Sequence, residues 1–210
     1  MPNIPNTVPG VDLYHGDQVE SFYQLRVHGC RVAVLKLGEA TEPDPAFASR
    51  AKVAPNMGLR VGAYWFVRPD VSTAFQVSTI IKQLPPKMPL FLDLEPSLRV
   101  PGNLSSDRWL DLNKVETRQR VLAAFVSTLK VADIFAGLYC TKGFWENVLG
   151  APDGYQAHPW WAARYSDEEP EQAKNLGPWA GWQYSESQSV AGIGNPVDTS
   201  IWRKSFWGIS

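Results

Sequence analysis

The stretch that decides the fold is MPLFLDL (Met88–Leu94), and an earlier stretch of the same kind is VAVLKL (Val32–Leu37). Both are nearly all apolar, without the alternation of apolar and polar residues that marks a half-exposed strand. A strand reads this way when both of its faces are buried, as in a parallel sheet covered by helices. The two stretches therefore predict buried parallel strands.

Outward from these runs, short apolar segments alternate with segments of helical period. The predicted strands are Val11–Leu13, Arg31–Leu37, Arg60–Phe66, Pro89–Leu94, Phe135–Tyr139, Trp160–Ala163, Gly181–Tyr184 and Val197–Ile201. The predicted helices are Val19–Val27, Pro45–Ala54, Ser72–Gln83, Lys114–Val131 and Phe144–Leu149. Such alternation favours βαβ units and an α/β fold.

The length of the chain limits the form of this fold. A regular β/α barrel needs about 250 residues, whereas this chain has 210, and its helices shorten toward the C-terminus. We therefore predict an irregular, compressed TIM-like β/α barrel. Because no internal repeat or linker interrupts the sequence, residues 1–210 are expected to form a single catalytic domain.

Local breakers are expected to set the ends of the helices. Gly29, Gly58 and Gly137 can adopt the positive φ that ends a helix before a strand. Ser72 is expected to cap the N-terminus of a helix that the prolines after Leu84 terminate.

Two acids follow the apolar run, in Phe91-Leu92-Asp93-Leu94-Glu95-Pro96. Residues two apart in a strand point to the same face, so Asp93 and Glu95 are expected side by side, with α-carbons roughly 6–7 Å apart. Two carboxyl groups this close, backed by apolar residues, cannot both ionise at low cost, and one pKa should rise. A carboxylic acid that keeps its proton near neutral pH is what a glycosidase uses to protonate a leaving oxygen.

Two further acids are predicted to lie near this pair. Asp12 follows Gly10-Val11 in the first strand, and Asp198 follows Pro196-Val197 in the last. If the barrel closes, its first and last strands are neighbours, and both acids would then face the same mouth as Asp93 and Glu95. Acids on three separate strands at one mouth, where β/α barrels carry their active sites, favour a catalytic site over surface decoration.

Composition excludes several other classes of protein. A formal net charge of −1 gives no basic surface for nucleic acid. Two cysteines, Cys30 and Cys140, are too few for a disulfide scaffold or a cysteine-rich zinc site, and they are expected to be free thiols. The three histidines, expected at the surface or in loops, show no metal-binding spacing, and no serine-hydrolase elbow or phosphate-binding loop is present. No membrane span or signal peptide is visible in the sequence.

Taken together, the short motifs resemble glycoside hydrolase family 25, the Chalaropsis-type lysozymes or muramidases. The resemblance runs nearly end to end. The matching segments are Gly10–Asp12, Ala33–Lys36, Val61–Pro69, Leu92–Glu95, Gly137–Tyr139, Trp161–Tyr165, Trp182–Ser185 and Gly194–Asp198.

This resemblance implies a β/α barrel that hydrolyses the β-1,4 bond between N-acetylmuramic acid and N-acetylglucosamine in peptidoglycan, without a cofactor or metal. Glu95 would be the general acid and later the base, and Asp93 would orient the substrate's acetamido group or stabilise positive charge at the anomeric carbon. Asp12 and Asp198 would position these groups and bind substrate. Tyr64, Phe66, Tyr139, Trp161 and Gln183 are the expected substrate-binding residues.

The chain departs from the family pattern in three segments. The small hydroxyl residue and Glu-Gly that usually follow Lys36 are replaced by Leu37–Ala40. Ser200 stands where asparagine is usual, and Leu13–Asp17 lacks the common serine. These changes leave the four acids intact and bear on substrate preference. Lys36, in an apolar strand, needs a partner, which is either a mouth acid or solvent.

Two alternatives remain open from the sequence: a chitinase-like glycosidase, and a non-catalytic glycan-binding protein on the same scaffold. The polar segment Pro96–Asn113 is expected to border the cleft. We expect a monomer that reaches the cell wall after release or export. A phage lysis enzyme is the favoured source, with a secreted effector or a digestive enzyme as the other interpretations.

Overall fold

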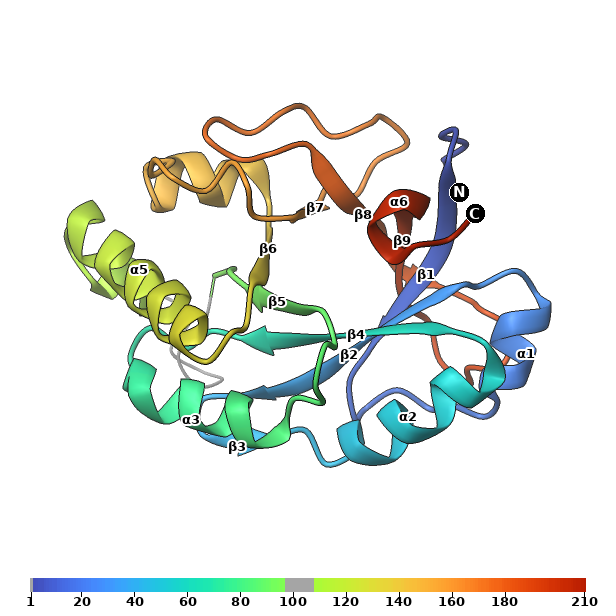
Figure 1. Ribbon diagram of the computed structural model, residues 1–210. Coiled ribbons are helices and arrows are strands. Elements are labelled where there is room, and N and C mark those ends of the chain that lie inside the picture. The colour runs from blue at the N-terminus through green and yellow to red at the C-terminus, as the bar shows by residue number, and fades with distance from the viewer. Residues whose placement is uncertain (1, 97–107) are drawn as a thin grey trace.

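The computed structural model describes residues 2–96 and 108–210 (Figure 1). Its strands are β1 (Thr7–Leu13), β2 (Val32–Glu39), β3 (Glu42–Pro43), β4 (Arg60–Phe66), β5 (Leu90–Asp93), β6 (Ala136–Cys140), β7 (Trp160–Ala163), β8 (Trp179–Gln188) and β9 (Val197–Arg203). Its helices are α1 (Phe22–Val27), α2 (Phe47–Val53), the 3-10 turn η1 (Ala54–Met57), α3 (Thr73–Gln83), α4 (Arg108–Asp111), α5 (Val115–Val131), the π-helical turn η2 (Phe144–Val148) and α6 (Lys204–Trp207).

The strands close into a barrel. Parallel pairing runs from β1 through β2, β4, β5, β6 and β7 to β8, and β9 then pairs antiparallel with both β8 and β1. The short strand β3 lies outside this ring, in an antiparallel hairpin with β2. Helices α5, α3, α2 and α1 follow one another around the left, lower and right parts of the barrel in Figure 1, whereas loops lie beside β7 and β8. The predicted irregular α/β barrel is therefore confirmed.

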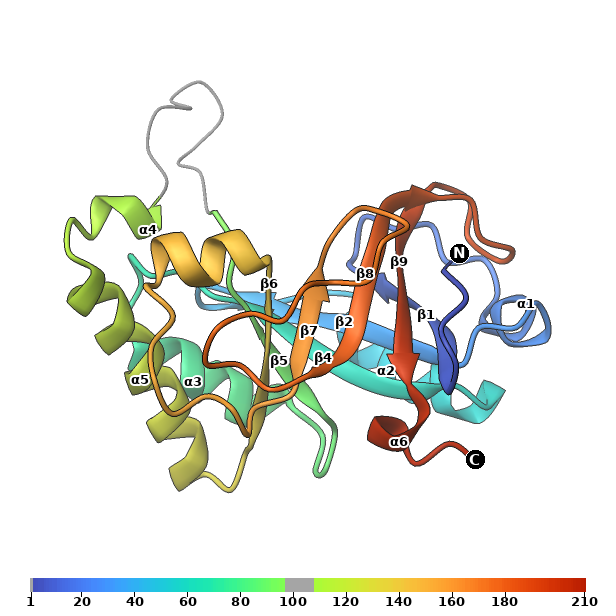
Figure 2. The same cartoon turned by 90° about the horizontal axis from the view of Figure 1, so that it is seen from above.

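Alternation along the strands divides the apolar residues between two cores. Leu92, Leu94 and their equivalents face outward and pack against helix residues such as Phe125. Inside the barrel, Phe91 packs against Trp161 and Trp202. The last helix, α6, which follows the lower end of β9 in Figure 2, adds Phe206 and Trp207 to this cluster. This inner cluster fills the lower half of the barrel and forms an apolar floor beneath the mouth.

Large rings fit inside the barrel because glycines face them. A β-carbon at Gly181 would lie 2.5 Å from the Trp202 ring, and one at Gly137 would lie 2.5 Å from the Phe91 ring. Gly62 likewise leaves room for Trp207, because a β-carbon at Gly62 would lie 2.8 Å from the Trp207 ring. The prediction that Gly137 supplies a positive φ is wrong, because its role is close packing within β6; Asp133, with a φ of 59°, makes that turn.

All eight predicted strands and all five predicted helices are present; β4 and β7 have the predicted bounds, and the others have shifted ends. The sequence analysis missed β3, η1, α4 and α6, all of which are four residues long or less. Gly29 and Gly58 have the predicted positive φ. Ser72 does precede α3, but its side chain makes no capping hydrogen bond. Cys30 and Cys140 are free, as predicted, and both are buried.

The fit between Gly181 and Trp202 predicts that Gly181→Ala destabilises the fold. Forcing a methyl group into a filled interior typically costs about 1–3 kcal/mol, because the buried Trp202 ring would have to move. Urea unfolding followed by circular dichroism would measure this loss. Gly143→Ala is the matched control, since a β-carbon there has no neighbour closer than 3.9 Å. A Gly181 variant as stable as the wild type would contradict the packing argument.

Candidate active site

One cavity of about 530 Å³ opens at the mouth of the barrel, and all nine predicted site residues line it. The four acids are Asp12, Asp93, Glu95 and Asp198, and the other five are Tyr64, Phe66, Tyr139, Trp161 and Gln183. These residues come from β1, β4, β5, β6, β7, β8 and β9 or the residues just after them. The fold therefore brings together every residue that the sequence singled out.

The two acids after the apolar run share one face, as predicted. Phe91 points into the inner cluster, and Asp93 and Glu95 continue the same alternation up to the mouth. Asp93, the last residue of β5, is only 5% exposed. Within the described residues its Oδ1 atom is buried without a hydrogen-bond partner. Such an oxygen is costly to leave unpaired, so it is suited to accept a hydrogen bond from a ligand.

Asp12 and Asp198 meet across the β1–β9 pairing, where they are direct register partners. Gln183 on β8 lies between them and donates from Nε2 to both oxygens of Asp12 at 3.1 Å and to Oδ2 of Asp198 at 3.2 Å. Its Oε1 accepts a 2.7 Å bond from the hydroxyl of Tyr139. One buried amide thus fixes both carboxyl groups.

The direction of β9 explains how Asp198 reaches the mouth. Asp198 is the second residue of β9, as it is in the predicted strand Val197–Ile201. Because β9 runs antiparallel to β1 and β8, its beginning lies at the mouth and its end lies at the floor. Asp198 therefore lies at the mouth, as predicted.

Burial raises the pKa values of all four acids. The pKa of Glu95 rises to about 7, chiefly through desolvation and then through the charge of Asp198, while Lys36 lowers it. Desolvation also raises the pKa of Asp93, with Glu95 as the next cause. The pKa of Asp198 rises to about 6 by desolvation, and that of Asp12 rises by desolvation and by its proximity to Asp198. The site therefore holds protons near neutral pH.

Aromatic rings form the walls of the cavity. Trp161 packs edge-on against Tyr64 and Tyr139, with ring centroids 6.2 and 4.6 Å away. Tyr64 and Phe66 face the cavity, whereas Trp65 between them is buried in the outer core, because successive side chains of a strand point to opposite faces. Rings of this kind offer flat apolar surface with polar edges, which suits a sugar ring.

The cavity also has lining residues that were not among the nine predicted site residues: Tyr14, Lys36, Glu39, Tyr165, Glu186 and Ser187. Tyr14 and Tyr165 are 46% and 51% exposed, at the rim. Tyr165 ends one of the family motifs, which was an available signal for it. For Glu39 the signal was the need of Lys36 for a counter-charge.

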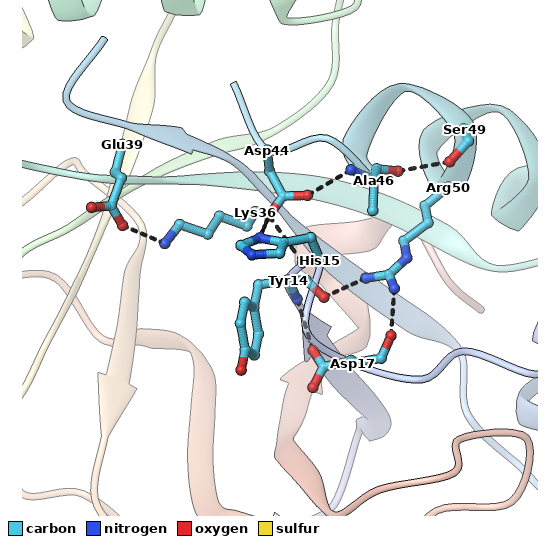
Figure 3. Close-up of polar contacts among 9 residues, drawn as sticks. All are labelled: Tyr14, His15, Asp17, Lys36, Glu39, Asp44, Ala46, Ser49 and Arg50. Carbon is cyan, nitrogen blue, oxygen red and sulfur yellow. Dashed lines mark hydrogen bonds and ion pairs between the residues drawn. The ribbon is translucent and has the colours of Figure 1, made fainter. Parts of the chain in front are cut away.

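The rim loop after β1 is held in place by a polar network (Figure 3). Asp17 accepts a 2.8 Å bond from the backbone N–H of Tyr14, and Arg50 donates to the carbonyl oxygens of both residues at 2.6 Å. The ring of His15 lies 2.8 Å from Asp44, whose other oxygen accepts from the backbone of Ala46. These bonds fix Tyr14 at the edge of the cavity.

The other two histidines lie away from the cavity lining. His28 contacts the carbonyl oxygen of Gln24. His158 lies in the loop before β7, as the prediction of a surface or loop position allows, and it is buried there and contacts the carbonyl oxygen of Ala136 at 2.7 Å.

Two other kinds of feature are absent from the part of the chain that the structure describes. No group of three or more His, Cys, Asp or Glu there could hold a metal ion. None of the helices in residues 2–96 and 108–210 is long and apolar enough to cross a bilayer. Most of the segment predicted to border the cleft, residues 97–107, lies outside the described residues.

A barrel mouth with two adjacent carboxyl groups, one with a pKa near 7, has the features of a glycoside hydrolase. The sequence model described as Glycosyl hydrolases family 25 matches residues 11–193. The chain belongs to this family.

Individual proteins are also similar to this chain over most of its length. Lysozyme M1 of Streptomyces globisporus is 25% identical over 205 residues, which cover 91% of this chain and 66% of that protein. YegX of Escherichia coli strain K12 is 28% identical over 210 residues, covering 93% of this chain and 69% of that protein. The chain thus spans about two thirds of the length of these relatives. The crystal structure of a lysozyme from Streptomyces coelicolor matches with a TM-score of 0.81 and 24% identity, covering 93% of this chain and 91% of that one.

The burial of Glu95 predicts that its carboxyl group loses its proton at a higher pH than an exposed glutamate does. Because its folded pKa is raised, its carboxyl group should keep its proton below pH of about 7 and lose it above. Carbon-13 NMR of side-chain carboxyl groups would show this as a signal with a midpoint near 7 that is absent from Glu95→Gln. A Glu95 midpoint in the ordinary range for glutamate, near ~4.3, would contradict the geometry.

Proposed function

We propose that this protein is a muramidase, or lysozyme, that hydrolyses the β-1,4 bond between N-acetylmuramic acid and N-acetylglucosamine in peptidoglycan. The observation that carries the proposal is the inward-facing pair Asp93 and Glu95 at the mouth of the barrel. Membership of glycosyl hydrolases family 25 and a relative named as a lysozyme support the choice of substrate. The chitinase-like and non-catalytic alternatives have no comparable support.

Glu95 is the proton donor in this proposal. Its raised pKa, about 7, lets it carry a proton at neutral pH and transfer that proton to the glycosidic oxygen as the bond breaks. The same group, then ionised, removes a proton from the water that completes hydrolysis. Its partial exposure at the rim gives water access for this second step.

Asp93 assists from the same strand face. Its unpartnered Oδ1 can accept a hydrogen bond from the N–H of the substrate's acetamido group. That bond would orient the acetamide carbonyl oxygen toward the anomeric carbon, where it can attack in place of an enzyme nucleophile. The charge of Asp93 would then stabilise the cyclic oxazolinium intermediate, and water would open it from the opposite face with retention of configuration.

Asp12 and Asp198 complete the polar side of the site. Gln183 holds their carboxyl groups in fixed positions, which suits hydrogen bonding to sugar hydroxyls. Tyr64, Phe66, Tyr139 and Trp161 provide the apolar walls. Asp198 also stands as the alternative nucleophile, because it is partly exposed to the same cavity.

The remaining aspects of the proposal concern context. We infer that the protein works as a monomer, since one chain carries all the groups invoked, and that its net charge of −1 does not favour nucleic acid. Its action requires release or export to the cell wall. A role in phage lysis is one context that fits such an enzyme.

Clearing of peptidoglycan suspensions, followed by identification of the new reducing-end sugar, tests the proposed function. Muramic acid at the new reducing end is the expected result. Glucosamine there would support the chitinase-like alternative, and no new reducing end would support the non-catalytic one.

Glu95→Gln should keep the fold and lose hydrolysis, because the amide matches the acid in shape but cannot protonate the leaving oxygen. Loss of a general acid typically lowers the rate by about 10²–10⁴-fold. Turbidity assays with equal amounts of folded protein would measure the loss. Glu116→Gln, on the exposed start of α5, is the matched control. A Glu95 variant with more than about a tenth of wild-type activity would exclude this role.

The stereochemical course tests the role of Asp93. Proton NMR of the first-formed sugar should show the retained anomer, and an inverted product would exclude both the substrate acetamide and Asp198 as the nucleophile. Asp93→Asn should slow the reaction strongly without an enzyme-linked sugar appearing in mass spectra. Trapping of a covalent adduct would instead identify an enzyme nucleophile, of which Asp198 is the candidate.

A further inference from the structure

Lys36 lies in the cavity among carboxyl groups, and the proposed reaction does not yet use it. Its Nζ atom is 2.6 Å from Oε2 of Glu39, and its side chain is 16% exposed. The other oxygen of Glu39 accepts a 2.9 Å bond from Arg68. Glu39 therefore bridges two cations. Its contact with the tip of Lys36 is drawn in Figure 3.

A β-bulge in β2 creates this pair. In a regular strand, residues three apart point to opposite faces. Here Lys36 pairs with Tyr64 and Glu39 pairs with Phe66, while the register shifts between Lys36 and Gly38. Leu37 is the extra residue, so Glu39 returns to the inner face and meets Lys36. Bulges beside active sites commonly re-aim a side chain in this way.

Gly38 is required at this bulge. A β-carbon there would lie 2.2 Å from the carbonyl oxygen of Glu42 and 2.7 Å from the ring of Trp65. The ring of Phe66 flanks the lysine, with its centroid 5.4 Å from Nζ. The sequence Lys-Leu-Gly-Glu thus forms a bulge that holds the ammonium group of Lys36 at the mouth of the barrel.

That cation acts on the reacting acids. The acidic groups that influence Asp93 are Glu95 after β5, Glu39 on β2 and Asp12 on β1. Tyr64 on β4 and Tyr139 on β6 also face it. Lys36 lowers the pKa of both Asp93 and Glu95, against burial and the neighbouring negative charges.

We propose that Lys36, oriented by Glu39, is a positioning residue that stabilises the carboxylate form of Asp93 in the active site. The role of Asp93 rests on the proposed function, because only a reacting Asp93 needs its negative charge when the acetamide approaches. The charge balance itself is a property of the free protein and can be measured without substrate.

The test is a carbon-13 NMR titration of Asp93, assigned by its absence in Asp93→Asn. Lys36→Met keeps the length and apolar character of the stem but removes the charge, so the pKa of Asp93 should rise by about one unit, the low end of the effect of a nearby opposite charge. Lys36→Arg should restore the wild-type titration. Lys82→Met, on the exposed surface of α3, should leave it unchanged.

Glu39→Gln gives an opposite expectation. The amide can still accept a hydrogen bond from Lys36, but the negative charge that raises the Asp93 pKa is gone, so this pKa should fall. If Lys36→Met does not fold, the Asp93 titration in Glu39→Gln still tests the proposal. A folded Lys36→Met with an unchanged Asp93 titration, or a Glu39→Gln with an unchanged or raised one, would overturn the proposal.

Activity provides the second readout. If the wild type hydrolyses peptidoglycan, the pH profile of kcat/KM for Lys36→Met should move to higher pH by the same interval as the NMR titration. A uniform loss of rate with no shift would indicate a merely structural role and overturn the proposal. A wild type without hydrolytic activity would defeat the proposed function while leaving the titration result to stand.

Discussion

The cost of keeping carboxyl groups above an apolar floor governs the rest of this structure. Asp12 and Asp93 are buried, and the rings of Phe91, Trp161 and Trp202 lie beneath the mouth. Water cannot solvate these acids fully, so each must hold a proton, find a donor or lie near a cation. Gln183 donates to Asp12 and Asp198, and Lys36 supplies the cation. The four acids lie within the described residues, and only one of their oxygens, Oδ1 of Asp93, is buried without a hydrogen-bond partner.

Closure of the barrel by an antiparallel strand places two of these acids together. A parallel final strand would need a crossover of a dozen or more residues, usually a helix, on the outside of the barrel. The antiparallel strand β9 follows β8 after a short loop and pairs on both sides. This return saves chain length, which is how 210 residues suffice, and it turns the beginning of β9 toward the mouth. Compression of the barrel and the Asp12–Asp198 contact thus have one cause.

Much of the fold and site could be predicted because strand alternation is local. The shared face of Asp93 and Glu95 follows from a period of two and was predicted correctly. The same period turns Trp65 away from the cavity that Tyr64 and Phe66 line. The direction of β9 could not be predicted from local pattern, since parallel and antiparallel buried strands have similar composition. Two further features were missed because they depend on contacts between segments that are far apart in the sequence. The bulge at Leu37 shows only in the register of β2 against β4, and the packing role of Gly137 depends on a ring from another strand.

The structure shows which contacts are made by the residues that depart from the family pattern. Ser200, at the usual asparagine position, is 1% exposed and accepts a 3.0 Å bond from the indole N–H of Trp161. It is not among the residues that line the cavity. A change at this position therefore reaches a substrate indirectly, through neighbours such as the Trp161 ring. The departure at Leu37–Ala40 is different, because Glu39 faces the cavity and holds Lys36. Of these two departures, the one in β2 is thus the one that acts directly on the charge of the site.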